Sequence, residues 1–172
     1  MDWSATLEAN YSKAGMERIA RLIADGTLSF RELWEVIQTG DPPLPRRAAW
    51  AMGHTLEHKP ELFQSIASEA AEALQTPQHD AIYRALLKGF LCLPVIAEEQ
   101  QGPLFDRAIR WILDPKAGTA VRVFSISLAA KIAAGIPELE EEVCLSIESQ
   151  WEQGTAGFHS RGRKVLKRFR NQ

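Results

Sequence analysis

An internal repeat with a period of about 38 residues constrains this 172-residue chain more than any other feature. Four stretches of helical character carry an arginine near their start, and successive arginines lie 37, 38 and 39 residues apart: Arg47, Arg84, Arg122 and Arg161. The tripeptide Pro-Glu-Leu also recurs 77 residues apart, at 60–62 and 137–139, which equals two periods. Such a period has room for two helices, and one hairpin cannot bury its apolar stripe alone. The repeat therefore predicts stacked helical hairpins.

Apolar residues recur at helical spacing along nearly the whole chain, whereas alternating runs typical of strands do not occur. Ser29 followed by Glu32 is typical of a capping box, and Gly or Pro ends most segments. The predicted helices are 12–24, 29–39, 45–58, 60–75, 79–92, 103–114, 119–134, 137–152 and 158–170. The sequence thus predicts an all-α fold, a right-handed α-α superhelix of about four hairpins with an N-terminal capping helix, in a single domain over residues 1–172.

Composition is that of an ordinary globular protein, with 45% hydrophobic and 24% charged residues. The N-terminal residues lack the basic and apolar regions of a signal peptide, and no apolar run is long enough to cross a bilayer. We therefore expect a cytoplasmic protein of bacterial type that does not interact with a membrane.

The charge is unevenly spread along the chain. Residues 1–156 carry 14 Lys+Arg and 22 Asp+Glu, whereas residues 157–172 carry six basic residues and no acidic one. The basic residues of this last predicted helix are Arg161, Arg163, Lys164, Lys167, Arg168 and Arg170. Its apolar residues, Phe158, Val165, Leu166 and Phe169, share one face, which is suited to covering the end of a helical stack or to lying on a partner or membrane surface.

The hairpins at 29–58, 60–92, 103–134 and 137–170 resemble HEAT repeats, in which the Arg-bearing second helix lines the concave face. HEAT-like repeats often place an aspartate in the turn before that arginine, and Asp41, Asp80 and Asp114 take this place here, with nothing acidic before Arg161. The chain also resembles a group of small bacterial HEAT-like proteins of unassigned function, in the stretches 10–14, 47–50, 59–62, 120–125, 137–139 and 157–161. This resemblance implies the solenoid and implies no function. The label adenylosuccinate lyase, which such proteins sometimes carry, does not fit, since that lyase is a much longer chain and its active-site loop is not recognisable here.

We expect a non-enzymatic scaffold that presents its concave surface to a protein partner, because curved helical repeats offer a long groove. Phosphate-loop and dinucleotide-binding motifs do not occur, and the serines have no partners of a catalytic triad by motif, so we expect no cofactor and no catalytic residue. Arg47, Trp50 and His54 share one helix face by their spacing of three and four. The candidate partner-contact residues are Arg47, Trp50, His54, Arg84, Lys88 and Arg122.

Nucleic-acid binding is the alternative function. Some HEAT-like proteins are DNA glycosylases that hold the DNA backbone in a basic cleft with aromatic walls and an acidic residue, and the arginine row, Trp50, Trp111 and Asp114 are the matching residue types. Against this, the acidic body repels nucleic acid, and one arginine per repeat can instead bond a neighbouring loop and fix the stacking of hairpins.

The segment His54-Thr55-Leu56-Glu57-His58 fits the H-x-x-E-H pattern of inverted zinc peptidases, and its spacing places both imidazoles on one helix face. Those peptidases need a third ligand from a distant helix and a substrate cleft, in a much longer protein. We therefore interpret the segment as the polar end of an amphipathic helix and predict no metal site.

Overall fold

The computed structural model describes residues 1–171, and within them it contains ten α-helices, two 3₁₀ helices and no strand. The helices are α1 (Trp3–Ala9), α2 (Lys13–Ala24), α3 (Phe30–Thr39), α4 (Leu44–His58), η1 (Pro60–Ile66), α5 (Ala67–Leu74), α6 (Asp80–Cys92), α7 (Glu98–Leu113), α8 (Thr119–Ala133), α9 (Pro137–Ser149), η2 (Trp151–Gln153) and α10 (Ala156–Arg170). The predicted all-α class is confirmed. The chain separates into two compact units, Met1–Leu93 and Pro94–Gln172, and their union in a single domain stays a prediction.

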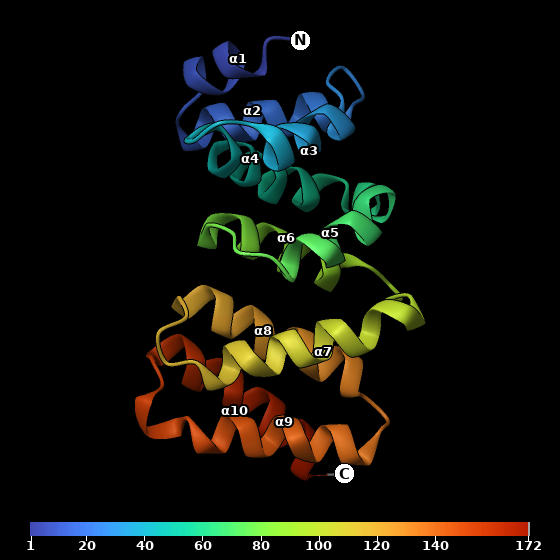
Figure 1. Ribbon diagram of the computed structural model, residues 1–172, viewed down its shortest axis with the longest axis vertical. Coiled ribbons are helices and arrows are strands. Elements are labelled where there is room, and N and C mark those ends of the chain that lie inside the picture. Colours follow the sequence, from blue (N-terminus) through green and yellow to red (C-terminus); the bar gives the residue numbers. More distant parts are fainter. Residues whose placement is uncertain (172) are drawn as a thin grey trace. The chain divides into compact units, whose positions relative to one another are not determined.

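In the N-terminal unit, α2, α4 and α6 form one layer, and α3, η1 and α5 pack against it (Figure 1). The central helix α4 contacts α2 on one side and α6 on the other. Its buried residues are mostly small: Ala48, Ala49 and Ala51 bury their methyl groups completely or nearly so, together with Met52. Small side chains let neighbouring helices approach closely on several sides, so α4 becomes the core helix of this unit.

The hairpin turns of this unit follow local capping chemistry. Ser29 is the N-cap residue of α3, and its hydroxyl accepts a hydrogen bond from the Glu32 amide. This confirms one half of the predicted capping box. The Glu32 carboxylate is used differently: it accepts a hydrogen bond from Trp3 Nε1 of α1 at 3.0 Å. Gly26, with φ +87°, ends the preceding turn in the left-handed region that glycine adopts without strain.

The sequence did not predict helix α1. This helix takes over part of the capping role that was expected of the first predicted helix, 12–24. Asp2 caps α1 through its side chain, and Trp3 and Leu7 are buried. Helix α2 instead packs along α4 as a member of the helix layer.

Three predicted helices have different bounds in the structure. The helix expected over 60–75 begins as 3₁₀ helix η1, in which residues three apart share a face; Phe63 and Ile66 are accordingly both buried. The helix expected to begin at Pro103 begins five residues earlier, with Glu98 and Glu99 in its first turn. Acidic side chains in a first turn stabilise a helix because they interact favourably with the positive end of its dipole. The helix expected over 137–152 ends at Ser149 and continues as η2.

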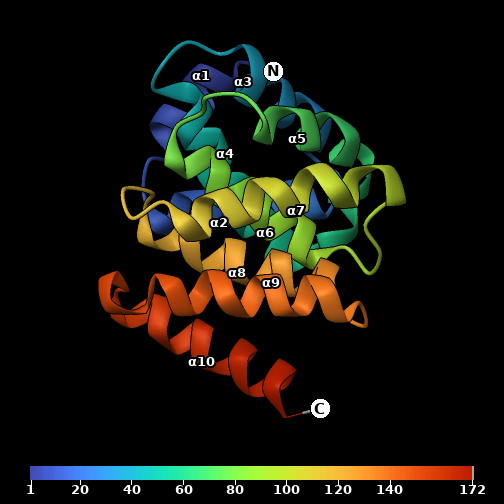
Figure 2. The same ribbon diagram turned by 60° about the horizontal axis from the view of Figure 1, so that its bottom comes forward.

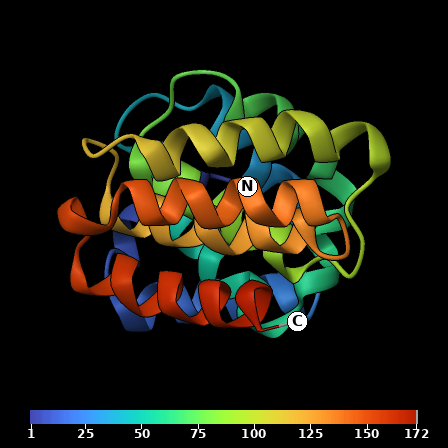
Figure 3. The same ribbon diagram turned by 90° about the horizontal axis from the view of Figure 1, so that it is seen from below.

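In the C-terminal unit, α7 and α9 pack on α8, and α10 contacts both α8 and α9 (Figure 2). Figure 3 shows α9 and α10 side by side. Of the predicted apolar face of α10, Phe158 and Val165 are buried, and Leu166 and Phe169 are half-buried. Arg170 pairs with Glu141 and Glu148 of α9, so acidic and basic runs meet across this last hairpin.

Candidate functional site

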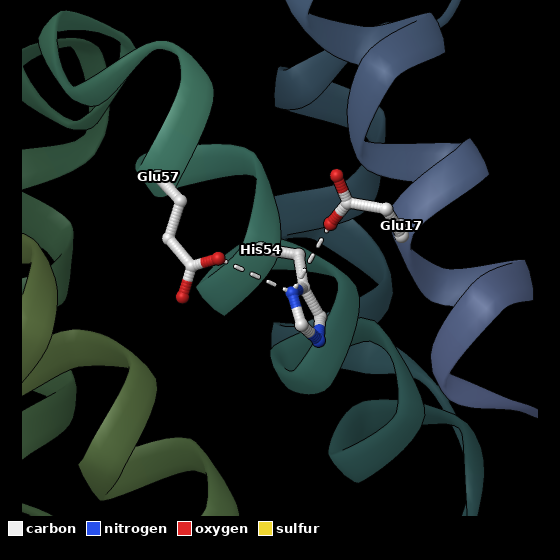
Figure 4. A group of neighbouring side chains, drawn as sticks. All are labelled: Glu17, His54 and Glu57. Atoms are coloured by element: carbon white, nitrogen blue, oxygen red, sulfur yellow. Dashed lines mark ion pairs between the residues drawn. The ribbon is translucent and has the colours of Figure 1, made fainter.

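Polar side chains gather in the N-terminal unit where α2 lies along the second half of α4. Glu17 extends from α2, and His54 and Glu57 extend from α4 (Figure 4). We refer to these three residues as the Glu–His cluster. Each offers one ligand-type atom, and the three atoms lie within 4.8 Å of one another.

In each of the two carboxylates of the cluster, one oxygen lies near His54 and the other oxygen contacts different side chains. Glu17 Oε2 and Glu57 Oε2 each lie 3.4 Å from His54 Nδ1. Glu17 Oε1 lies 2.7 Å from His58 Nε2 and 3.3 Å from Arg21 Nε. The outer oxygens are thus held by neighbouring cations or donors, and the inner oxygens face the His54 ring.

Lys88 of α6 holds the Glu57 carboxylate. Its Nζ donates to Glu57 Oε1 at 2.6 Å and to the Gly53 carbonyl at 2.7 Å, which ties α6 to α4. The hydrogen bond from Lys88 lowers the pKa of Glu57, and the hydrogen bond to His58 is the largest cause that lowers the pKa of Glu17. Both carboxylates are therefore ionised at neutral pH.

His54 Nδ1 is the polar atom at the centre of the cluster. It is buried, and within residues 1–171 no hydrogen bond satisfies it, although the side chain as a whole is 15% exposed. Two carboxylate oxygens thus converge on one ring nitrogen at 3.4 Å, so that negative charge gathers around this point.

A second group of side chains lies near the first turns of α4, and we call Tyr11, Arg47 and Trp50 the aromatic–arginine patch. The Tyr11 and Trp50 rings meet edge to face with centroids 5.8 Å apart. The Arg47 guanidinium lies 4.4 Å from the Tyr11 centroid. Tyr11 is 53% exposed and Trp50 37%, so this unit presents two large aromatic rings to its surroundings. Arg47 Nε has no hydrogen-bond acceptor in the described chain.

The candidate contact residues predicted from the sequence fall into three environments. Arg47, Trp50 and His54 lie on one face of α4, and the Trp50 and His54 rings are 6.3 Å apart. Arg84 of α6 is exposed, and Lys88 one turn later is engaged with Glu57. The structure brings these residues to α4 and α6, which pack together.

Arg122, the remaining candidate, lies in the C-terminal unit and is only 3% exposed. Its Nη2 donates to the Ile112 carbonyl at the end of α7, and its guanidinium lies 4.4 Å from the Phe158 ring centroid of α10. Burial lowers the pKa of this guanidinium, and Asp114 opposes that shift. Arg122 thus joins three helices of its unit, and we leave it out of the contact set proposed below.

The basic residues of α10 are not equivalent. Arg170 is engaged by Glu141 and Glu148, and Arg161 is half-buried. The exposed cations that have no carboxylate within ion-pair distance in the described structure are Arg163, Lys164, Lys167 and Arg168.

Three members of these groups, Tyr11, Glu17 and Glu57, were not predicted as site residues. Helical periodicity assigns residues to faces of their own helix, and it does not say which side chains meet between α2 and α4. The Glu57 position after His54 was part of the H-x-x-E-H pattern, but its partner Glu17 lies far away in the sequence.

An open groove of about 770 Å³ lies at the other end of α4, between the loop that precedes it and the loop that precedes α6. Its lining is mainly apolar and includes Ile37, Pro42, Pro45, Pro77 and Ile82. Arg46 and His79 also line it, and His79 Nδ1 is used as the N-cap acceptor for the Ala81 amide. No nucleophile paired with a base lines this groove.

The comparisons with known proteins agree with this architecture. A family model described as a HEAT repeat domain matches residues 3–169. No curated protein and no solved structure matches the chain. HEAT repeat domains are typically non-enzymatic helical scaffolds for protein interaction. Across residues 1–171, no helix has the length and apolar character needed to span a membrane.

Proposed function

The chain belongs to the HEAT repeat domain family, and from this premise we propose that it binds a protein partner through the face of the layer α2–α4–α6, which we take as the concave face of its repeats. The proposed contact residues are Arg47, Trp50, His54, Arg84 and Lys88, now joined by Tyr11. We propose further that the partner presents an acidic segment with an apolar anchor to this face.

The aromatic–arginine patch carries this proposal. Tyr, Trp and Arg are the residue types that most often dominate the binding energy of protein interfaces, because they combine large apolar area with a polar end. Trp50 and Tyr11 hold each other edge to face, and Arg47 is stacked on Tyr11. These mutual contacts restrict the side chains before binding, which reduces the entropy lost when a partner docks.

The charge of the patch points to an acidic partner. Arg47 is partly exposed and pairs with no carboxylate in the described structure, so its guanidinium can form a charge-assisted hydrogen bond with an acidic partner. Arg46 and Arg84 are exposed on the same pair of helices. Mixed aromatic and cationic surfaces of this kind suit a partner segment in which acidic side chains flank an apolar one.

The test compares capture of partner proteins from a native extract by the wild type, Trp50→Ala and Arg47→Glu. We expect both variants to retain less than a tenth of the bound partner, because one removes the aromatic anchor and the other repels an acidic segment. Arg110→Glu is the matched control, since Arg110 is an exposed arginine in the C-terminal unit. Equal capture by all four proteins, each with an unchanged circular dichroism spectrum, contradicts the proposal.

A second candidate function, nucleic-acid binding, is favoured by the four exposed cations of α10. Residues 163 and 167, and residues 164 and 168, are each four apart, so the four side chains follow one stripe of the helix. If these cations contact phosphates, the logarithm of the affinity for duplex DNA falls with the logarithm of salt concentration with a slope of about −3 to −4. Absence of binding to DNA and RNA oligonucleotides at about 50 mM salt removes this candidate.

A further inference from the structure

We propose that the Glu–His cluster of the N-terminal unit is a binding site for a divalent transition-metal ion of the Zn²⁺ type, with Glu17, His54 and Glu57 as its three protein ligands. This inference goes beyond the protein-binding function proposed above and does not depend on it. It also replaces the sequence-based interpretation, in which the two histidines of one helix were considered as ligands and then set aside.

The distances within the cluster fit a metal ion. In a tetrahedral zinc site with bonds of about 2.0–2.1 Å, neighbouring ligand atoms are about 3.3–3.4 Å apart. His54 Nδ1 lies 3.4 Å from Glu17 Oε2 and 3.4 Å from Glu57 Oε2, and the third separation is at most 4.8 Å. A point equidistant from three atoms so arranged lies about 2.4 Å or less from each of them, and small side-chain rotations shorten this to bonding distance.

The chemistry of the central atom supports the same conclusion. His54 Nδ1 is buried without a hydrogen bond in the described chain and faces two oxygens that can only accept (Figure 4). A proton on Nδ1 can be directed at one of these oxygens at a time, whereas a dication between them bonds the nitrogen and both oxygens at once. One imidazole with two carboxylates is a ligand set that suits Zn²⁺ and its neighbours in the first transition series.

The ligands are already oriented by a surrounding set of side chains. Lys88 holds Glu57 Oε1, and His58 with Arg21 holds Glu17 Oε1, so that in each glutamate the other oxygen points at His54. Hydrogen bonds of this kind, which fix the rotamers of the ligating carboxylates, are typical of the outer contacts around protein metal sites. Glutamate binds a metal ion through its ionised carboxylate, which is the ordinary form of this side chain at neutral pH.

The ligands come from two helices of one compact unit, so a bound ion joins α2 to α4. Glu57 is 52% exposed in its side chain, which leaves the ion open on one side. A three-ligand site with an open fourth position accepts water or an acidic group of another molecule.

The experiment is a titration of Zn²⁺ into the full chain, purified without a histidine tag and stripped with chelator, followed by calorimetry. Co²⁺ serves as a second probe, because its visible absorption reports the coordination geometry. We expect one equivalent of Zn²⁺ per chain, and an affinity at least tenfold lower in Glu57→Gln and in His54→Ala. Glu72→Gln is the matched control, since Glu72 is an exposed glutamate of α5 in the same unit.

The variant His58→Ala separates this site from the pattern read in the sequence. His58 contacts Glu17 and not the proposed ion, so this variant keeps one equivalent of Zn²⁺ and the cobalt spectrum of the wild type. If His58→Ala abolishes binding as His54→Ala does, the ligands are the two histidines of α4 and the proposed geometry is wrong. If the wild type shows no saturable binding, or if Glu57→Gln binds as the wild type does, the cluster is an ion-pair network and the proposal fails. These readouts measure metal binding alone, so failure here leaves the proposed partner surface, which shares only His54 with the Glu–His cluster, untouched.

Discussion

At the scale of single residues, Glu69 shows how one carboxylate can join two helices of a repeat. Glu69 of α5 accepts two hydrogen bonds from Arg31, at 2.5 and 3.1 Å, and one from Trp34 Nε1 at 2.8 Å, both on α3. Trp34 is fully buried, so its indole N–H needs an acceptor. Helices α3 and α5 are thus linked by a charge-assisted contact as well as by apolar packing.

Glu69→Ala is expected to lower the free energy of unfolding by about 1 kcal/mol, because it leaves the Trp34 indole without its acceptor. This loss in the free energy of unfolding is at the low end for a lost hydrogen bond, since Glu69 is partly exposed and water can replace its carboxylate as the acceptor. Urea denaturation measures this loss. Glu72→Ala on the same helix is the control and should change stability by less than half as much.

The same contact predicts a pH dependence. The hydrogen bond from Arg31, followed by the one from Trp34, lowers the pKa of Glu69 below its ordinary value of 4.5. The stability that the ionised carboxylate contributes is therefore present above pH 4.5 and is lost as pH falls through the lower, folded-state pKa. The stability difference between wild type and Glu69→Gln should shrink between pH 7 and pH 3; a difference that stays constant contradicts this assignment.

At the scale of elements, the close approach of α6 and η1 depends on one missing side chain. A Cβ atom added at Gly89 of α6 would lie 2.1 Å from the Phe63 ring of η1. Phe63 is fully buried and meets the Phe90 ring edge to face at 5.0 Å. Glycine at 89 therefore lets Phe63 pack directly against the helix backbone, although a glycine in the interior of a helix lowers the stability of that helix.

Gly89→Ala should lower the free energy of unfolding by about 1–3 kcal/mol, because displacing a buried ring costs more than the helix propensity that alanine gains. Gly53→Ala in α4 is the matched control, since nothing lies within 4 Å of a Cβ added there. This control should be neutral or stabilise by up to about 1 kcal/mol. Both changes can be read from chemical denaturation midpoints, and a stable Gly89→Ala would show that η1 and α6 are less closely packed.

The elements that the sequence predicted well are those with strong local signals. Ser29 with Glu32 marks the start of α3, and the arginine period locates α4, α6, α8 and α10 within a few residues. The misplaced start of α7 came from treating Pro103 as a first-turn residue, whereas Glu98 and Glu99 carried the better signal. Helix α1 has seven residues, too few for a periodic pattern to identify.

The candidate site was less predictable than the fold. Periodicity placed Arg47, Trp50 and His54 on one face of α4, but contacts between helices decide the rest. Tyr11 and Glu17 meet α4 only after α2 has packed along it. The arginines of the row also lie in different environments, because the helices around each of them differ from repeat to repeat.

Arg84 and Arg122 illustrate that difference and give a direct test. Arg122 is buried and bonds the end of α7, whereas Arg84, one period earlier, is exposed. Arg122→Ala should lower the free energy of unfolding by about 2–4 kcal/mol, through lost packing on Phe158 and an unpaired Ile112 carbonyl. Arg84→Ala should cost less than about 0.5 kcal/mol. Equal effects in a denaturation series would mean that the two arginines have the same role.

At the scale of the whole molecule, the family match over residues 3–169 spans both compact units. Each unit builds its own core from paired helices, and each presents a different surface. The N-terminal unit carries the aromatic–arginine patch and the Glu–His cluster. The C-terminal unit carries the exposed cations of α10. Because the two candidate binding surfaces belong to different units, the two candidate functions can be distinguished by which part of the chain a bound ligand protects from hydrogen exchange.

Hydrogen–deuterium exchange on the chain bound to its captured partner tests the central proposal most directly, because it locates the contact surface without a substitution. We predict slower exchange in peptides that cover residues 11–21, 44–58 and 80–92, with α10 exchanging as in the free protein. Protection of α10 alone, with α4 unchanged, would contradict a partner surface on the aromatic–arginine patch and would favour the basic helix as the binding element.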